Sequence, residues 1–277
     1  MKIFVDSADI EDIKKAEEYG LCDGVTTNPS LIKKAVARVK GEGKDINMED
    51  YIRMICKTVG KGGSVSLEVV SLDAGNMVKE AERLYEKFNP VAGNVAIKIP
   101  VSTSRKDDED HYEGIKAMKI LREKKIPVNA TLVFTPEQAL LAARAGASFV
   151  SPFAGRVDDY IRKKMGKERG KDFEKFDYYP AEGMESGEAK VHDEGILSGV
   201  HLVEKIMNVL GKYNFDTEVI AASLRNYRQV REVAELGVHI ATVPFPVLEE
   251  MIKHPKTFEG IINFSEDVVP EYKKVFL

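Results

Sequence analysis

Residues 94–101 of the sequence spell NVAIKIPV, an apolar run that contains one charged side chain, Lys98. A run that is apolar at consecutive positions is typical of a strand covered on both faces. A lysine in such a strand has to reach water with its charged end, pair with a carboxylate or take part in chemistry. The run therefore indicates a buried sheet and makes Lys98 the first candidate functional residue.

Seven other short apolar runs alternate with helical, charge-bearing stretches. The eight expected strands cover residues 3–6, 24–28, 64–70, 95–101, 128–134, 149–153, 218–223 and 239–245. One helix is expected to open on Thr135 with Pro136 and Gln138 behind it and to close at Gly146, and a second to run from Asn226 to Gly237. Eight strand–helix units predict an α/β fold with a closed (β/α)8 TIM barrel. An open doubly wound sheet is the main alternative, which the lack of a GxGxxG motif after the first strand disfavours.

The composition limits the class of protein. The chain has 277 residues and a formal net charge of −4, which fits one domain over residues 1–277 and gives no reason to expect nucleic acid or an anionic membrane as partner. No run of 18 apolar residues is present, and the N-terminal MKIFVDSAD leads straight into a strand, so neither a spanning helix nor a signal peptide is expected. Cys22 and Cys56 form no CxxC motif, which indicates free thiols and a cytoplasmic location.

Four segments depart from the simple alternation. Residues 37–48 and 102–111 are expected to be loops, and residues 160–194 a long polar insertion after the sixth strand. Within it, residues 162–175 carry seven basic and three acidic side chains. The insertion is either a solvated loop or a lid or subunit contact, because long loops in compact domains are often functional. Residues 256–277 are expected to form an amphipathic helical tail that packs on its own barrel or on a neighbouring subunit.

Polar side chains recur near the carboxyl ends of the expected strands, where the active sites of such barrels lie. Each has a structural alternative: Lys98 and Glu68 as a simple ion pair, Asp6 as a helix cap, Asn28 as a helix start, Thr131 and Ser151 as partners of backbone groups, and Arg225 in solvent. Their convergence from at least seven strands favours a catalytic site. The candidates are Asp6, Thr27, Asn28, Glu68, Lys98, Asn129, Thr131, Ser151, Phe153, Arg156, Ser223 and Arg225.

Six motifs carry a family resemblance: FVDSAD, GVTTNPSLI, AIKIP, NATLVFTPEQA, SPFAGRVDD and AASLRN. Together they are similar to the transaldolases and the related fructose-6-phosphate aldolases, over residues 1 to about 255. The resemblance implies a barrel in which Lys98 forms a Schiff base with a ketose. It also implies transfer rather than simple cleavage, because the aldolase subgroup has a glutamine at the position of Glu68 and a tyrosine at that of Phe153. The 160–194 insertion departs from the short members of the family.

The resemblance also implies roles for the other candidates. Asp6 would take the proton of the C4 hydroxyl, and Glu68 with Thr131 would hold a water. Asn28 and Asn129, with Thr27 and Ser151 beside them, would hold the dihydroxyacetone hydroxyls. Arg156, Ser223 and Arg225 would clamp the phosphate, since guanidinium groups match phosphate oxygens. Burial of Lys98 among hydrocarbon neighbours is expected to favour the neutral, nucleophilic amine.

The expected activity is transfer of dihydroxyacetone from fructose 6-phosphate to erythrose 4-phosphate, a reaction of the non-oxidative pentose phosphate pathway. The alternatives are a fructose-6-phosphate aldolase and, in another class, a sugar-phosphate binding protein without catalysis. We expect no cofactor and no metal, because His111, His192, His201, His239 and His254 are scattered along the chain. By resemblance to short family members, a homo-oligomer built on pentamers or decamers is favoured.

Overall fold

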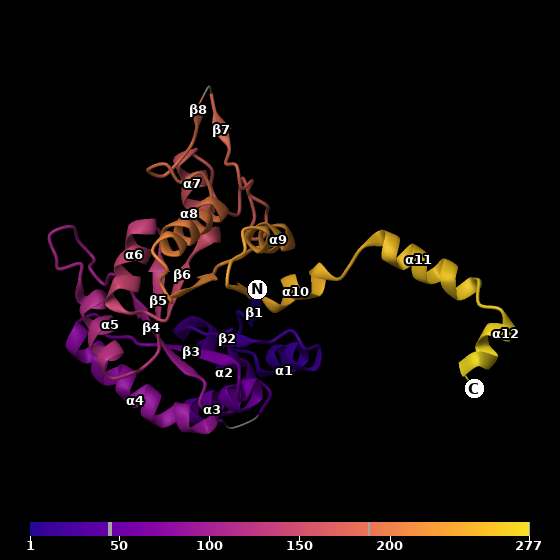
Figure 1. The fold of residues 1–277 in the computed structure, drawn as a ribbon, viewed down its shortest axis with the longest axis horizontal. Helices are drawn as coiled ribbons and strands as arrows, with labels where there is room; N and C mark the ends of the chain where they lie inside the picture. The colour runs from indigo at the N-terminus through magenta and orange to yellow at the C-terminus, as the bar shows by residue number, and fades with distance from the viewer. Residues whose placement is uncertain (44–45, 188, 277) are drawn as a thin grey trace.

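Eight parallel strands close into a barrel in the computed structural model, which describes residues 1–43, 46–187 and 189–276. The closed barrel and its surrounding helices confirm the predicted (β/α)8 fold (Figure 1). Around the barrel the order is β1-β10-β9-β6-β5-β4-β3-β2, so each strand neighbours those next to it in the barrel sequence. The barrel strands are β1 (Lys2–Val5), β2 (Gly24–Thr26), β3 (Ser64–Glu68), β4 (Val95–Pro100), β5 (Val128–Val133), β6 (Phe149–Pro152), β9 (Glu218–Ala221) and β10 (Ile240–Val243).

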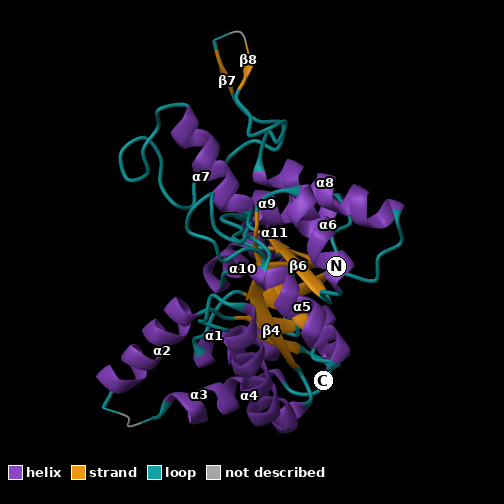
Figure 2. Cartoon of the chain, turned by 90° about the vertical axis from the view of Figure 1, so that its left-hand side faces the viewer, coloured by secondary structure: helices purple, strands orange, loops and turns teal. Residues whose placement is uncertain are grey.

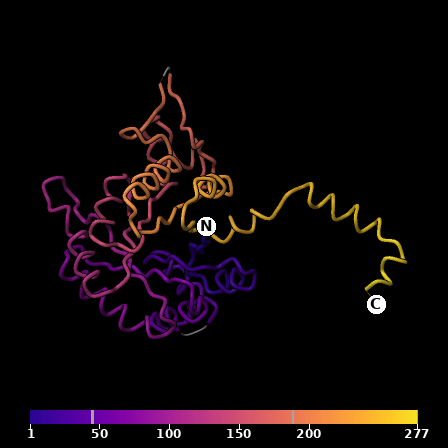
Figure 3. Tube along the Cα trace, viewed as in Figure 1, coloured from indigo at the N-terminus to yellow at the C-terminus, as the bar shows by residue number. Residues whose placement is uncertain are grey.

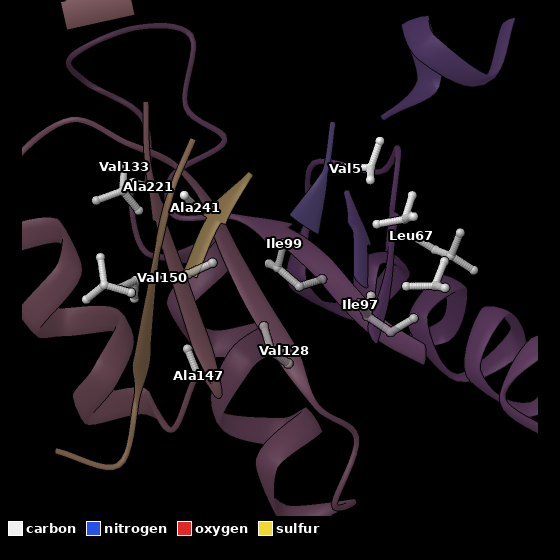
Figure 4. Packing of buried hydrophobic residues seen from close by; sticks show 14 of the residues in the cluster. Val5, Leu67, Ile97, Ile99, Val128, Val133, Ala147, Val150, Ala221 and Ala241 are labelled. Carbon is white, nitrogen blue, oxygen red and sulfur yellow. The ribbon is translucent and has the colours of Figure 1, made fainter. Parts of the chain in front are cut away.

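The alternation of side chains in β4 decides where Lys98 points. Ile97 and Ile99 are fully buried in the large cluster between strands and helices (Figure 4). Because successive side chains of a strand leave on opposite faces, Lys98 between them points into the barrel. A separate small cluster of Phe4, Ile220 and Ile240 fills the barrel interior below this level.

Helices surround the strands on the outside (Figure 2). They begin with the caps that the sequence indicates: Thr135 and Gln138 form a capping box at the start of α6, and Gly146 ends it in the left-handed region at φ +97°. The barrel helices are α1 (Ile10–Glu18), α2 (Pro29–Gly41), α3 (Met48–Val59), α4 (Ala74–Ala92), α5 (Glu113–Glu123), α6 (Pro136–Ala145), α7 (Ala154–Lys164), α8 (Gly199–Lys212), α9 (Tyr227–Glu235) and α10 (Phe245–Met251).

Two of the expected loops differ from the structure in part. Helix α2 continues to Gly41, so residues 37–41 are helical because their apolar positions still face the protein, as buried Val36 and partly buried Val39 show. Of the expected loop 37–48, residues 44–45 lie outside the described residues. The segment 102–111 contains no helix or strand, as expected. Helix α7 runs to Lys164, so the irregular part of the insertion starts at residue 165 rather than 160.

Residues 165–198, described except for residue 188, connect α7 to α8 and are called the strap below. The strap contains a short antiparallel hairpin that the sequence did not predict, β7 (Glu185–Ser186) with β8 (Ala189–Lys190). The hairpin projects from the barrel at the top of Figure 1. The rest of the strap is irregular but contains buried Phe173 and Tyr179, so it is packed rather than wholly solvated.

The C-terminal segment leaves the barrel after α10. It forms α11 (Pro255–Glu266), α12 (Pro270–Lys273) and a 3₁₀ turn η1 (Lys274–Phe276), which we call the arm. The arm extends away from the barrel rather than packing on it (Figure 3), and neither of its α-helices has a buried residue. Exposed apolar side chains of the arm include Phe258, Ile261, Ile262 and Phe264. Within the described residues, no helix is both long and apolar enough to cross a membrane.

Candidate active site

A cavity of about 250 Å³ opens at the carboxyl ends of the barrel strands. Eight of the twelve residues proposed from the sequence line it, and these are Asp6, Asn28, Lys98, Ser151, Phe153, Arg156, Ser223 and Arg225. The other four, Thr27, Glu68, Asn129 and Thr131, do not line it. Thr27 and Glu68 contact Lys98, and Asn129 and Thr131 pair with residues of β4. The barrel therefore gathers side chains from both ends of the sequence into one pocket.

Lys98 is held at the cavity by two contacts. Its amine donates a hydrogen bond to the carbonyl of Thr27 at 3.0 Å and lies 3.1 Å from a carboxylate oxygen of Glu68. The strand register places Glu68 of β3 and Asn129 of β5 directly beside Lys98. Lys98 is only 5% exposed. The structure therefore contains the Lys98–Glu68 ion pair that the alternative interpretation expected. Lys98 also lines the cavity, so the ion pair does not separate the amine from a substrate there.

Asp6 follows β1 and is held by a threonine pair. Thr26 donates to the Asp6 carboxylate at 3.0 Å, and its hydroxyl lies 2.6 Å from that of Thr242 on β10. Burial raises the pKa of the Asp6 carboxyl above its ordinary value, and the charge of Lys98 offsets part of that rise. The cap of α1 is Asp9, not Asp6, so the helix-cap alternative for Asp6 is wrong. Asp6 is consequently free to act on the cavity.

A layer of polar side chains lies inside the barrel next to Lys98. Ser151 donates to Asn129 at 2.7 Å, and the Asn129 amide donates to Ser66 at 3.2 Å. The Thr27 hydroxyl donates to the Ser66 carbonyl at 2.7 Å. Because Asn129 and Thr27 are fully buried and already bonded, they orient the residues above them, whereas Ser151 reaches the cavity.

Strand β5 carries an irregularity at Thr131. Its pairing with β6 shifts between Ala130 and Val133, and Leu132 adopts φ +57°, in the left-handed region. Such bulges re-aim neighbouring side chains and are common beside active sites. The Thr131 hydroxyl is buried with no hydrogen-bond partner among the described residues. A buried hydroxyl without a partner is costly, which makes it a candidate to bind water or substrate.

The SPFAGR and SLR motifs meet at one side of the cavity. The backbone N–H of Gly155 donates to the Ser223 carbonyl at 3.2 Å, and a Cβ at this glycine would lie 2.3 Å from that same oxygen. Only glycine permits this approach, which fixes Arg225 against the start of α7. Ser223 adopts φ +60°, a left-handed conformation that is unusual for serine. The two motifs thus form one packed unit at the mouth.

Arg156 and Arg225 differ in their surroundings. Arg156 is exposed, stacks over the ring of Phe153 at 5.0 Å and has no carboxylate partner among the described residues. Arg225 is 6% exposed and pairs with Asp159 at 2.8 Å, so it is not the solvent-exposed residue of the alternative interpretation. Burial lowers the pKa of the Arg225 guanidinium below its ordinary value. Within the described part of the chain, Arg156 is thus an exposed cation without a carboxylate partner, whereas Arg225 is a buried cation in an ion pair with Asp159.

Sequence reasoning missed four polar or charged residues of the cavity: Thr26, Thr242, Arg169 and Lys175. The two threonines occupy inward positions of β2 and β10, so the period of two in these strands could have identified them. Arg169 and Lys175 belong to the strap, whose path no periodicity reveals. Within the described residues, no group of three or more His, Cys, Asp or Glu side chains is arranged to hold a metal ion.

The arrangement suits carbonyl chemistry on an anionic substrate. It offers an amine with an adjacent carboxylate, a second carboxylate whose pKa is raised, hydroxyl and amide groups, and several cations. A buried amine beside an acid–base group can add to a carbonyl and lose water, while cations hold a phosphate.

Comparison with known proteins agrees with these motifs. The family model described as transaldolase/fructose-6-phosphate aldolase matches residues 3–275. Two proteins called probable transaldolase, from Methanococcus maripaludis and Aquifex aeolicus, are each 41% identical, over 96% and 98% of this chain and 97% and 99% of their own lengths. A third of that name from Clostridium perfringens is 40% identical over 100% of this chain and 99% of its own.

A mandelate oxidase variant among solved structures has a TM-score of 0.46 and 12% identity, over 89% of this chain and 64% of its own, and this likeness informs neither fold nor function. The family model and the curated relatives confirm the resemblance first drawn from the six motifs. The chain is an enzyme of the transaldolase/fructose-6-phosphate aldolase family.

Proposed function

We propose that this enzyme is a transaldolase that moves a dihydroxyacetone unit from fructose 6-phosphate to erythrose 4-phosphate through a Schiff base on Lys98. The products are glyceraldehyde 3-phosphate and sedoheptulose 7-phosphate. The observation that carries the proposal is the Lys98 amine, 5% exposed, at the wall of the cavity and 3.1 Å from the Glu68 carboxylate. Relatives at about 41% identity that are called probable transaldolase support it.

The first step is addition of the amine to the ketose carbonyl. Lys98 passes a proton to Glu68, and the neutral amine attacks C2. The carbinolamine then loses its hydroxyl as water, protonated by the Glu68 carboxyl, and an iminium remains. The unpartnered hydroxyl of Thr131 is suited to hold that water together with Glu68.

The second step is cleavage of the bond between C3 and C4. Asp6 takes the proton of the C4 hydroxyl, the C3–C4 electrons move into the iminium, and glyceraldehyde 3-phosphate leaves an enamine on Lys98. The raised pKa of Asp6 favours such proton transfer, because it brings the carboxylate closer in basicity to the group it deprotonates. With erythrose 4-phosphate the enamine carbon forms the new bond, Asp6 returns its proton, and hydrolysis of the iminium frees the product.

Other side chains position the substrate. Asn28 uses its side-chain oxygen to cap α2, accepting from the Leu31 N–H at 2.9 Å, which leaves its amide N–H groups for a dihydroxyacetone hydroxyl. Ser151, oriented by Asn129 and the Thr27 layer, would contact another hydroxyl. We assign the phosphate contact to Arg156, Ser223 and Arg225, which also line the cavity.

Trapping with borohydride tests the proposal. Fructose 6-phosphate is added with borohydride, and peptide mass spectrometry is expected to find a reduced three-carbon adduct on Lys98. Release of glyceraldehyde 3-phosphate beyond one equivalent per active site is then measured with and without erythrose 4-phosphate. Continued release that depends on the acceptor supports a transaldolase, and continued release without it indicates an aldolase. Absence of any adduct leaves only sugar-phosphate binding and refutes the Schiff-base mechanism.

We also propose a cytoplasmic homo-oligomer, with pentamers or decamers favoured. The exposed apolar side chains of the arm support assembly, because an apolar helix face that leaves its own barrel is stabilised by covering it. The free thiols Cys22 and Cys56 fit a reducing compartment, and burial raises the pKa of Cys56 to about 11. Light scattering of the full chain measures the assembly.

A further inference from the structure

The strap brings positive charge to the cavity from outside the barrel. Arg169 and Lys175 both line the cavity, together with Arg156 and Arg225. The side chain of Lys175 has no carboxylate partner among the described residues, and its contact is the ring of Phe176 at 5.1 Å. Arg169 lies 3.6 Å from Asp159, the carboxylate that also pairs with Arg225.

Arg225 donates three hydrogen bonds to other groups of the protein. Its Nη2 donates to Asp159 at 2.8 Å, its Nε to the Ser223 carbonyl at 3.3 Å and its Nη1 to the backbone carbonyl of Lys175 at 3.2 Å. These bonds use three of the five guanidinium N–H groups, and the two that remain, one on each Nη, can still bind a phosphate. One of the three bonds, to the carbonyl of Lys175, also fixes the strap.

The charges around the cavity do not balance. Five cations, Lys98, Arg156, Arg169, Lys175 and Arg225, face three carboxylates, those of Asp6, Glu68 and Asp159. Ion pairs link Glu68 to Lys98, and Asp159 to Arg225, to Arg169 and, at 4.0 Å, to Arg162 of α7. Arg156 and Lys175 are left without a carboxylate within salt-bridge distance in the part of the chain that the structure describes. Two unpaired cations match the charge of a phosphate monoester, which is close to −2 at neutral pH.

The strap segment that carries Lys175 is anchored on both sides. Arg162 of α7 is 5% exposed and donates to the carbonyls of Asp177 and Tyr178 at 3.2 and 2.9 Å. Its guanidinium also lies over the rings of Phe173 and Tyr179, at 4.4 and 5.1 Å. Such a contact network orders residues 173–179, so the position of Lys175 is set before any ligand arrives.

We propose that Lys175, presented by the strap, is a further phosphate-binding residue that completes the anion subsite with Arg156 and Arg225, while the Arg225 bond to the carbonyl of Lys175 helps to hold the strap in place. The ligand class is the phosphate monoester of a ketose or aldose. This inference rests on the proposed function for the identity of the sugar, but not for binding of the anion. The strap would thereby make the enzyme selective for phosphorylated over unphosphorylated sugars.

The experiment compares Lys175→Met with Lys171→Met, a matched control on an exposed strap residue that does not line the cavity. Loss of one charge-assisted hydrogen bond is expected to raise KM for fructose 6-phosphate and erythrose 4-phosphate roughly 10- to 100-fold with little change in kcat. With unphosphorylated fructose and glyceraldehyde, kcat/KM should not change. Lys171→Met should resemble the wild type throughout, and Lys175→Arg should restore most of the affinity.

Titration with inorganic phosphate by calorimetry separates this inference from the proposed function. Weaker binding to Lys175→Met than to Lys171→Met supports the anion subsite even if no Schiff-base adduct is found. Equal phosphate affinity in the two variants overturns it, and so does an equal loss of activity with phosphorylated and unphosphorylated sugars. Circular dichroism and melting of both variants show whether either has lost its fold, and Lys175→Arg repeats the comparison with the charge retained.

Discussion

The barrel wall and the strap both supply residues to one cavity, but they place them by different means. In the wall, the strand register sets Glu68, Lys98 and Asn129 side by side, so neighbouring strands fix each position. In the strap, Lys175 depends on a few side-chain contacts to backbone carbonyls, made by Arg162 and Arg225. The wall is thus suited to hold the reacting groups, and the strap is suited to select the substrate.

The largest effect is expected at the centre of the wall. Lys98→Met keeps the length of the side chain and removes the nucleophile, so turnover should fall by at least roughly 10⁴-fold, and the borohydride adduct should disappear. Assays of transfer and mass spectrometry of the trapped protein measure both. Lys119→Met, on an exposed position of α5, is the control and should keep full activity. Turnover retained in Lys98→Met would contradict the assignment.

Asp6→Asn should come next in size. Removing the base is expected to lower kcat roughly 10²- to 10⁴-fold, while the amide oxygen still accepts from Thr26. The base acts as a carboxylate whose pKa is raised by burial above its ordinary value of 3.8, so activity should fall as the pH drops through that raised pKa. The pH profile of kcat/KM in the wild type should show this acidic limb. A limb that persists unchanged in Asp6→Asn would assign it to another group.

The fold could be predicted because each strand carries its own signal. Apolar runs bounded by helix caps predicted all eight barrel strands, and Thr135 with Gln138 predicted the start of α6. In a closed parallel barrel, knowledge of the strand ends is enough to bring Asp6, Lys98 and Ser223 together. Most site residues of the barrel wall could therefore be predicted from local sequence patterns and from the rule that the carboxyl ends of the strands meet at one face of the barrel.

The strap could not be placed in this way. Its residues have no period, and its path depends on Arg162 lying between Phe173 and Tyr179, residues 11 and 17 positions away along the chain. The charge-rich composition pointed to solvent, whereas the buried guanidinium and rings show a packed segment. The sequence also did not show that Arg225, expected to bind phosphate, donates to Asp159 and to a backbone carbonyl of the strap.

Arg162→Met sharpens the contrast between the two regions. It removes the charged donor of two partly buried carbonyls, which is expected to cost about 2 kcal/mol in the local stability of the strap. Hydrogen exchange of residues 173–179 should become faster and KM for phosphorylated sugars should rise about ten-fold, whereas the Lys98 adduct should still form. Lys163→Met, exposed on the same helix, is the control. Loss of the adduct would show that the strap is part of the reacting site.

Phe153→Tyr is expected to have the smallest effect, and it tests how the wall keeps the enamine from water. Phe153 lines the cavity between Arg156 and the edge of Phe134, and its ring carries no group that could activate a water. A tyrosine hydroxyl there should raise acceptor-independent release of glyceraldehyde 3-phosphate relative to transfer by a few-fold, about 1 kcal/mol in relative barrier. Phe134→Tyr adds the same hydroxyl to a ring outside the cavity and should leave the ratio unchanged. If both variants behave alike, exclusion of water does not depend on the residue at position 153, and the enamine is protected by the acceptor's own occupancy of the cavity.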